Sequence, residues 1–185
     1  MDKRIAQRKE AIRVTEKKLG KRMINERRAL NDDIRAFKIL ISENTLPPTM
    51  NVYKKDLQSC SQKGMARTGF VRDGKCTNHQ GDAGSHHVCI DVSDVDGNFC
   101  DATGQPDWCS KKSACHDDPG KSCPIENWCV CEWAFADYVD KKGCENIATV
   151  DCEATNHKVI EHYQDSSSPS VQNALACLKK KCNLE

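Results

Sequence analysis

One short segment carries most of the side-chain types that perform acid–base, nucleophilic or metal chemistry. Residues 82–89 contain a carboxylate, a hydroxyl, two imidazoles and a thiol, which belong to Asp82, Ser85, His86, His87 and Cys89. A cysteine activated by a histidine is a common enzymatic nucleophile. Such pairs are usually assembled from distant parts of a sequence, and no Gly-x-Ser-x-Gly motif is present. The favoured interpretation is a turn shaped by Gly84 and hydrogen-bonded through His86.

A second pair of candidate ligands, Cys129 and Cys131, lies two residues apart. On a strand their side chains would share a face, and on a turn both thiols could reach one metal ion. With Cys89 and either His86 or His87, they would complete a tetrahedral zinc set. Paired Cys-x-x-Cys motifs, the stronger zinc signal, are absent from the sequence. Disulfides are therefore favoured, and we expect no cofactor, with zinc as the alternative.

Cysteine is abundant and unevenly distributed. The chain has 13 cysteines, none before Cys60 and eleven between Cys60 and Cys152. An odd number leaves at least one that is free, pairs between chains or binds something else. Residues 100–131 are polar and rich in turns, so disulfides would order them by lowering the entropy of the unfolded chain. The disulfide candidates outside the segments above are Cys60, Cys100, Cys109, Cys115, Cys123, Cys144, Cys152, Cys177 and Cys182.

The first 50 residues differ from the rest in charge and pattern. Their net charge is +6, which leaves −5 for residues 51–185. Residues 2–43 contain no proline and many helix formers, which predicts one long helix. On a heptad repeat, its apolar seam is too broken for a self-sufficient coiled coil and favours packing on other subunits. The predicted partner-binding residues are Ile5, Ile12, Leu19, Met23, Leu30 and Phe37.

Composition divides the chain into three parts. Residues 1–45 form the basic helical arm, residues 46–68 a linker that begins near Pro47 and Pro48, and residues 69–185 a cysteine-rich domain. The alternatives for the arm are a solvated helix whose last turns pack on the domain, and a nucleic-acid-binding helix. Charge asymmetry favours an acidic partner surface.

Short elements are expected inside the domain. Residues 88–92 and 147–150 are predicted strands, residues 133–139 a helix that ends at Gly143, and residues 157–163 a helical turn. A final helix is predicted from Pro169 to about Lys181, with Ser168 as its N-cap. The predicted fold class is α+β: a small disulfide-stapled domain with short strands and helices, preceded by a long N-terminal helix.

Four segments, in this order, resemble motifs of a bacterial family known as domain of unknown function 2237: Gly69–Cys76, Asp82–Cys89, Trp128–Cys131 and Glu153–Thr155. The resemblance covers about residues 69–162 and implies no particular activity. The family positions that it matches are Cys76, Cys89, Cys129, Cys131 and His86, which implies that these side chains lie together as a disulfide or metal cluster. The arm and the C-terminal helix with Cys177 and Cys182 lie outside the resemblance.

The favoured function is that of a structural or assembly protein rather than an enzyme. No secretory signal is recognised and no segment approaches the roughly 20 apolar residues of a membrane span, so we expect synthesis in the cytoplasm and no membrane crossing. Disulfides are rare there without a dedicated oxidant, which some large DNA viruses encode. The specific hypothesis is a minor capsid component, located in the virion and bound to other protein subunits. The alternatives are a Cys/His-dependent redox or zinc-binding enzyme, and a nucleic-acid binder through the arm.

Overall fold

The computed structural model describes residues 49–93 and 99–185, together with Met23, Arg27 and Leu30. The chain divides into two units, Met1–Leu46 and Pro47–Glu185. In the first unit, Met23 and Leu30 are helical, and their side chains are 66% and 60% exposed. The rest of the predicted 2–43 helix lies outside the described residues, and so do the seam residues Ile5, Ile12, Leu19 and Phe37. The partner-binding role of the arm therefore stays a prediction.

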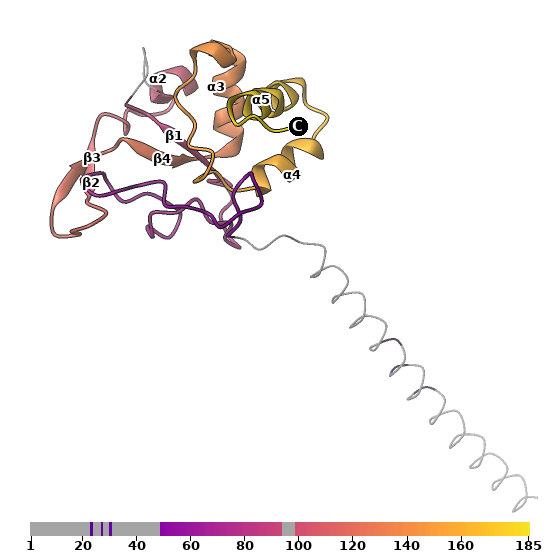
Figure 1. Ribbon diagram of the computed structural model, residues 1–185, viewed down its shortest axis with the longest axis horizontal. Helices are drawn as coiled ribbons and strands as arrows, with labels where there is room; N and C mark the ends of the chain where they lie inside the picture. The colour runs from indigo at the N-terminus through magenta and orange to yellow at the C-terminus, as the bar shows by residue number, and fades with distance from the viewer. Residues whose placement is uncertain (1–22, 24–26, 28–29, 31–48, 94–98) are drawn as a thin grey trace, which may run out of the picture. The chain divides into compact units, whose positions relative to one another are not determined.

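Helices form most of the second half of the domain (Figure 1). They are α3 (Glu132–Lys142), α4 (Lys158–Gln164) and α5 (Pro169–Lys181). Helix α5 begins with proline at its first position after the N-cap Ser168, and its last turn holds three lysines that complement the helix dipole. Helix α3 ends at Gly143, whose φ of 76° suits glycine. The three helices predicted in this half of the domain are confirmed, with bounds shifted by at most a few residues.

Apolar side chains from these helices form the main core. Helix α5 packs against α3 and α4, and the short helix α2 (Phe99–Thr103) packs against α3. The aromatic rings of Phe99 and Tyr138 meet edge to face at 5.2 Å between centroids, and both side chains are almost completely buried. Leu178 of α5 is also fully buried. No helix of the described residues is long and apolar enough to cross a membrane.

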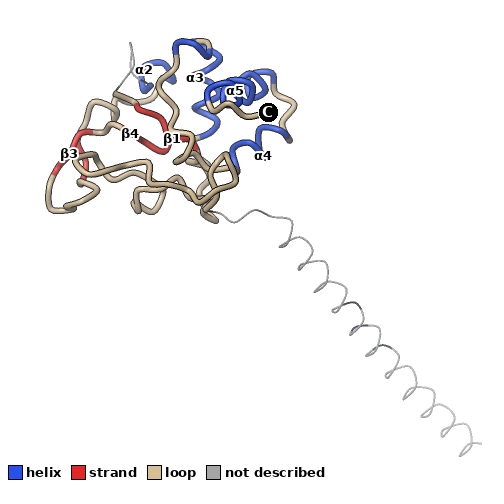
Figure 2. The backbone as a smooth tube through the Cα atoms, in the orientation of Figure 1, coloured by secondary structure: helices blue, strands red, loops and turns tan. Residues whose placement is uncertain are grey.

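The strands are short and form two antiparallel pairs, drawn in red in Figure 2. Strand β1 (Val88–Asp91) pairs with β4 (Asn127–Val130), and β2 (Lys112–Ala114) pairs with β3 (Ser122–Pro124). In the first pair, Cys89 lies opposite Cys129. Short strands and helices together confirm the α+β class of the domain.

The strand predicted at 147–150 is wrong. This segment makes one isolated bridge, between Val150 and Ile90 of β1, and the backbone N–H of Asp91 donates to the carbonyl of Thr149. The chain then turns away at Asp151, whose carbonyl accepts a hydrogen bond from the hydroxyl of Thr155. The segment therefore leaves β1 before a regular ladder can form.

The domain begins earlier in the sequence than Gly69. Leu57 and Thr68 are buried, although both belong to the predicted linker. The backbone N–H of Cys129 donates to the hydroxyl of Thr68 at 2.8 Å, which ties the segment to β4. Residues 49–68 are therefore an integral part of the domain, because their hydrogen bonds and buried side chains complete the side of β1 and β4 that the helices leave uncovered.

All thirteen cysteines lie in the described residues, and twelve of them form disulfides. The six disulfides are Cys60–Cys89, Cys76–Cys129, Cys100–Cys109, Cys115–Cys123, Cys144–Cys177 and Cys152–Cys182. The thiol of Cys131 is free and partly buried. Disulfides therefore account for twelve of the thirteen cysteines.

Candidate functional site

Two disulfides lie next to each other beneath the central strand pair. Because Cys89 and Cys129 are opposite one another in register, their side chains leave the same face of the two strands. Cys89 bonds to Cys60 and Cys129 bonds to Cys76. These four residues and Ala154 form a small buried cluster, separate from the main core. We call this group of four cysteines the twin disulfide.

The twin disulfide corresponds in part to the cluster that the family resemblance implied. The structure brings Cys76, Cys89 and Cys129 together, whereas Cys131 does not take part. Cys60, which the sequence offered only as a disulfide candidate, supplies the fourth sulfur. All four sulfurs of the cluster are used in disulfide bonds.

Cys131, which has a free thiol, follows β4 directly in the sequence. It is the N-cap residue of α3. The carbonyl of Cys131 accepts the first hydrogen bond of that helix, from the N–H of Phe135. Cys131 is one of the residues that line a cavity of about 390 Å³. Among the described residues, Cys131 is therefore the one cysteine with a free thiol, and it lies at the wall of this cavity.

The turn before β1 holds an aspartate–histidine pair at the same cavity. The carboxylate of Asp82 accepts hydrogen bonds from the N–H groups of Gly84 and His86, and it lies 2.7 Å from Nδ1 of His86. Burial alone raises the pKa of Asp82, but the hydrogen bonds from His86 and Gly84 outweigh that effect and hold the pKa below its usual value. The ionised carboxylate favours a proton on Nδ1, which leaves Nε2 of His86 as an acceptor.

Gly84 is required for this turn, as the sequence suggested. A Cβ atom at Gly84 would lie 2.5 Å from Cε1 of His86, which is too close for any side chain without displacement of the imidazole. His86 itself is 38% exposed, while the carboxylate of Asp82 is almost completely buried. The turn therefore presents an oriented imidazole to the cavity.

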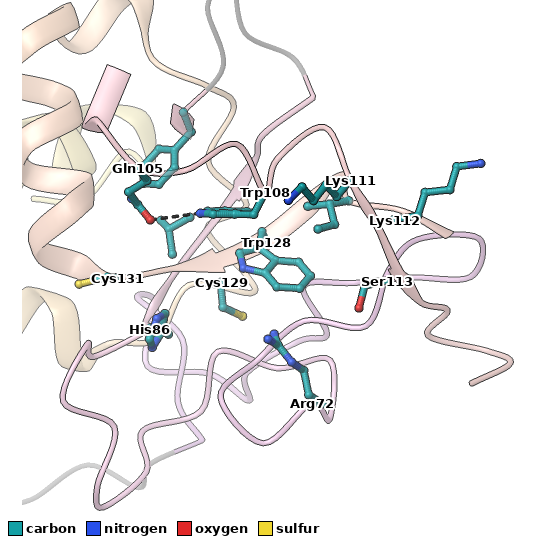
Figure 3. A pocket seen from close by; sticks show the side chains of 13 residues that line it. Arg72, His86, Gln105, Trp108, Lys111, Lys112, Ser113, Trp128, Cys129 and Cys131 are labelled. Carbon is teal, nitrogen blue, oxygen red and sulfur yellow. Dashed lines mark hydrogen bonds between the residues drawn. The ribbon is translucent and has the colours of Figure 1, made fainter. Parts of the chain in front are cut away.

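The other walls of the cavity are aromatic and basic. The guanidinium of Arg72 lies 4.8 Å from the ring centroid of Trp128, and the rings of Trp108 and Trp128 are 5.7 Å apart. The indole N–H of Trp108 donates to the side-chain oxygen of Gln105 (Figure 3). The lining, as described, holds no Asp or Glu; it consists of Arg72, His86, Phe99, Gln105, Trp108, Lys111, Lys112, Ser113, Ile125, Trp128, Cys129, Val130 and Cys131. Its chemistry suits a small anion with an apolar part.

The sequence did not single out the aromatic and basic walls. Arg72 belongs to a segment that carried the family resemblance, but its approach to Trp128 depends on a left-handed backbone, with φ of 58°. Trp108 is brought near β4 by the Cys100–Cys109 disulfide and by its packing on Phe99. Neither contact has a local sequence signal, because each joins residues far apart in the chain.

A family model described as an uncharacterized protein conserved in bacteria (DUF2237) matches residues 50–167, which is more than half of the chain. No curated protein matches the chain. The matched range contains the twin disulfide, the Asp82–His86 pair and Cys131. It starts close to Thr49, where the described domain begins, and it ends before α5.

Proposed function

The chain belongs to the DUF2237 family, and we propose that its domain is a disulfide-stapled structural component that the N-terminal arm anchors among other protein subunits. The observation that carries the proposal is the use of twelve cysteines in six disulfides within one small domain. So many cross-links increase resistance to unfolding, and they add no reactive group. A component of a lasting assembly benefits from both effects.

Charge supports the assignment of an anchoring role to the arm. The first 50 residues carry a net charge of +6 and the remainder −5. Exposed pairs of opposite charge add little affinity each, but a field of this kind steers association and selects an acidic partner surface. Met23 and Leu30, whose side chains are exposed, would supply apolar contact to that partner.

The most specific form of the proposal is a minor capsid component of a large DNA virus. A virus particle persists outside the cell, where the surroundings keep disulfides oxidised. A dense set of cross-links would stabilise the domain there without a large apolar core. The virion is then the proposed location, and the capsid proteins around the arm are the proposed partners.

Hydrogen exchange on the full chain tests whether the arm becomes ordered only when it binds other subunits. We expect amides between residues 5 and 40 to exchange rapidly in the dilute chain and to become protected when the chain joins its assembly. Strong protection of these amides in the dilute chain would mean that the arm folds on its own domain, and the anchoring role would be lost. Binding of the arm to nucleic acid is the competing outcome, and a steep loss of affinity with added salt would identify it.

A thiol-dependent enzyme is the second candidate, and the cavity favours it. Cys131 is free, and the same cavity contains the oriented imidazole of His86. A cysteine nucleophile is usually activated by an imidazole within hydrogen-bond reach, so this candidate function requires the Cys131 thiol and His86 to come that close. If this were the function, His86→Gln would slow alkylation of Cys131 by iodoacetamide at least tenfold. An unchanged rate would exclude activation by His86 and favour the structural proposal.

A further inference from the structure

A buried carboxylate lies between two imidazoles at the junction of the strands and the helices. The side chain of Glu132 is completely buried. One of its oxygens is 3.1 Å from Nδ1 of His87, and the other is 2.7 Å from Nδ1 of His162. His87 is also buried, whereas 38% of the His162 side chain is exposed. We call these three residues the His–Glu–His triad.

The backbone around the triad is firmly held. Glu132 is the first residue of α3; its N–H donates to the carbonyl of Ser85, and its carbonyl accepts a hydrogen bond from the hydroxyl of Tyr163. The N–H of His87 donates to the same carbonyl of Ser85. Burial raises the pKa of Tyr163, with the nearby Glu132 as a second cause, so the phenol keeps its proton and remains a donor. The segment before β1, helix α3 and helix α4 therefore bring the side chains of His87, Glu132 and His162 together.

The two imidazoles are the side-chain partners of the buried Glu132 carboxylate. No Lys or Arg of the described residues forms an ion pair with it, and a buried carboxylate is costly unless its surroundings compensate it. Nε2 of His87 is buried without a hydrogen-bond partner among the described residues, although most buried polar atoms have one. A buried carboxylate and an unpartnered imidazole nitrogen therefore lie at the same site.

We propose that the triad binds one divalent transition-metal ion, with zinc as the best fit. Two imidazole nitrogens and one carboxylate are the protein ligands of a common type of zinc site, which keeps a fourth position for water. One ligand atom from each residue lies within 4.8 Å of the others. Donors around tetrahedral zinc are about 3.3 Å apart, given bonds of about 2.0 Å. The His162 side chain is 38% exposed and can make this adjustment.

This site is separate from the cysteines and does not depend on the structural role proposed above. Its ligands are neutral imidazoles and a carboxylate, so binding requires no reduced thiol. A divalent ion would compensate the buried carboxylate of Glu132. It would also join the turn before β1 to α3 and α4, because each residue of the triad comes from one of these three segments.

Cobalt titration of the oxidised, chelator-treated full chain tests the proposal. Four-coordinate Co²⁺ has visible absorption, and Zn²⁺ should then displace it. We expect one equivalent of Co²⁺ per chain. His162→Ala and His162→Gln should each weaken binding at least about 100-fold, since even the loss of a residue that only supports a metal ligand costs about 10–100-fold. Circular dichroism will show that these half-exposed substitutions leave the fold intact.

Two matched variants make the result decisive. His79→Ala removes an imidazole outside the triad, and Cys131→Ser removes the free thiol next to Glu132; both should keep the original affinity for Co²⁺. The proposal is overturned if the unmodified chain binds no Co²⁺, in which case the triad is only a hydrogen-bonded group. It is equally overturned if binding survives in the His162 variants, or if it is lost in either control variant.

Discussion

The two sides of the domain solve the same stability problem in different ways. The strand side, residues 49–131, has short strands, long turns and four disulfides. The helical side, residues 132–185, has three α-helices that share an apolar core, and two disulfides. No disulfide joins one side to the other. The main apolar core draws side chains from both sides. The strand side alone has a second buried cluster, which is built almost entirely of disulfide-bonded cysteines.

The buried residues show the same difference. On the strand side, the twin disulfide is a cluster of its own, and all four of its cysteines are at most 2% exposed. On the helical side, the interior is made of aromatic and aliphatic side chains such as Phe135, Tyr138 and Leu178. The strand side should therefore be far more sensitive to reduction than the helical side.

Removal of one of the two disulfides in the twin disulfide should have the largest effect on the free energy of unfolding. Cys76→Ala/Cys129→Ala opens a cross-link between residues 53 apart in sequence, so we expect a loss of about 4 kcal/mol in the free energy of unfolding. Urea denaturation measures this loss. Cys131→Ala is the control and should change stability little. A loss below about 1 kcal/mol in the double variant would contradict the structural role of the twin disulfide.

A substitution that creates a cavity on the helical side should have the next largest effect on the free energy of unfolding. Leu178→Ala removes a completely buried side chain from α5, and we expect it to cost about 3 kcal/mol. Asn173→Ala, at an exposed position of the same helix, should stay within about 0.5 kcal/mol. Equal effects of the two substitutions would mean that α5 does not depend on its apolar contacts.

Removal of a disulfide that joins nearby residues of the strand side should reduce the free energy of unfolding less. Cys115→Ala/Cys123→Ala opens a cross-link between residues only 8 apart, with an expected cost of about 2.5 kcal/mol. The loss should be local, so amides of β2 and β3 should exchange faster while those of α3 keep their protection. Uniformly faster exchange over the whole domain would show instead that this disulfide supports the global fold.

The smallest expected effect is the contribution of His157, on the helical side, to the pH dependence of stability. Burial is the main reason that the pKa of His157 lies below its ordinary value. The unfolded chain therefore binds a proton at this histidine more readily than the folded chain does. Its contribution to stability is present above about pH 6.5 and is lost as the pH falls toward the lowered pKa. Urea midpoints between pH 7 and 5 should fall less steeply for His157→Gln, and identical slopes would contradict this.

The sequence predicted local features well. Ser168 and Pro169 marked the start of α5, and Gly143 marked the end of α3, because caps and helix stops depend on a few neighbouring residues. The number and density of cysteines indicated a cross-linked domain. These signals need no knowledge of which distant segments meet.

The pairing of distant residues could not be predicted in the same way. Nothing in the sequence joined Cys60 to Cys89, because twelve cysteines can pair in very many ways. The strand expected at 147–150 did not form because the chain turns away from β1 at Asp151 after a single bridge. The cavity walls and the His–Glu–His triad likewise depend on contacts between segments, which local patterns do not encode.

Disulfide mapping of the native, unreduced protein tests the central claim most directly. Free thiols are first blocked by alkylation under denaturing conditions, and the linked peptides are then identified by mass spectrometry. The structure predicts a single alkylated cysteine, Cys131, and linked peptides that include Cys60–Cys89 and Cys76–Cys129. Alkylation of these four cysteines, or a disulfide that contains Cys131, would contradict the account.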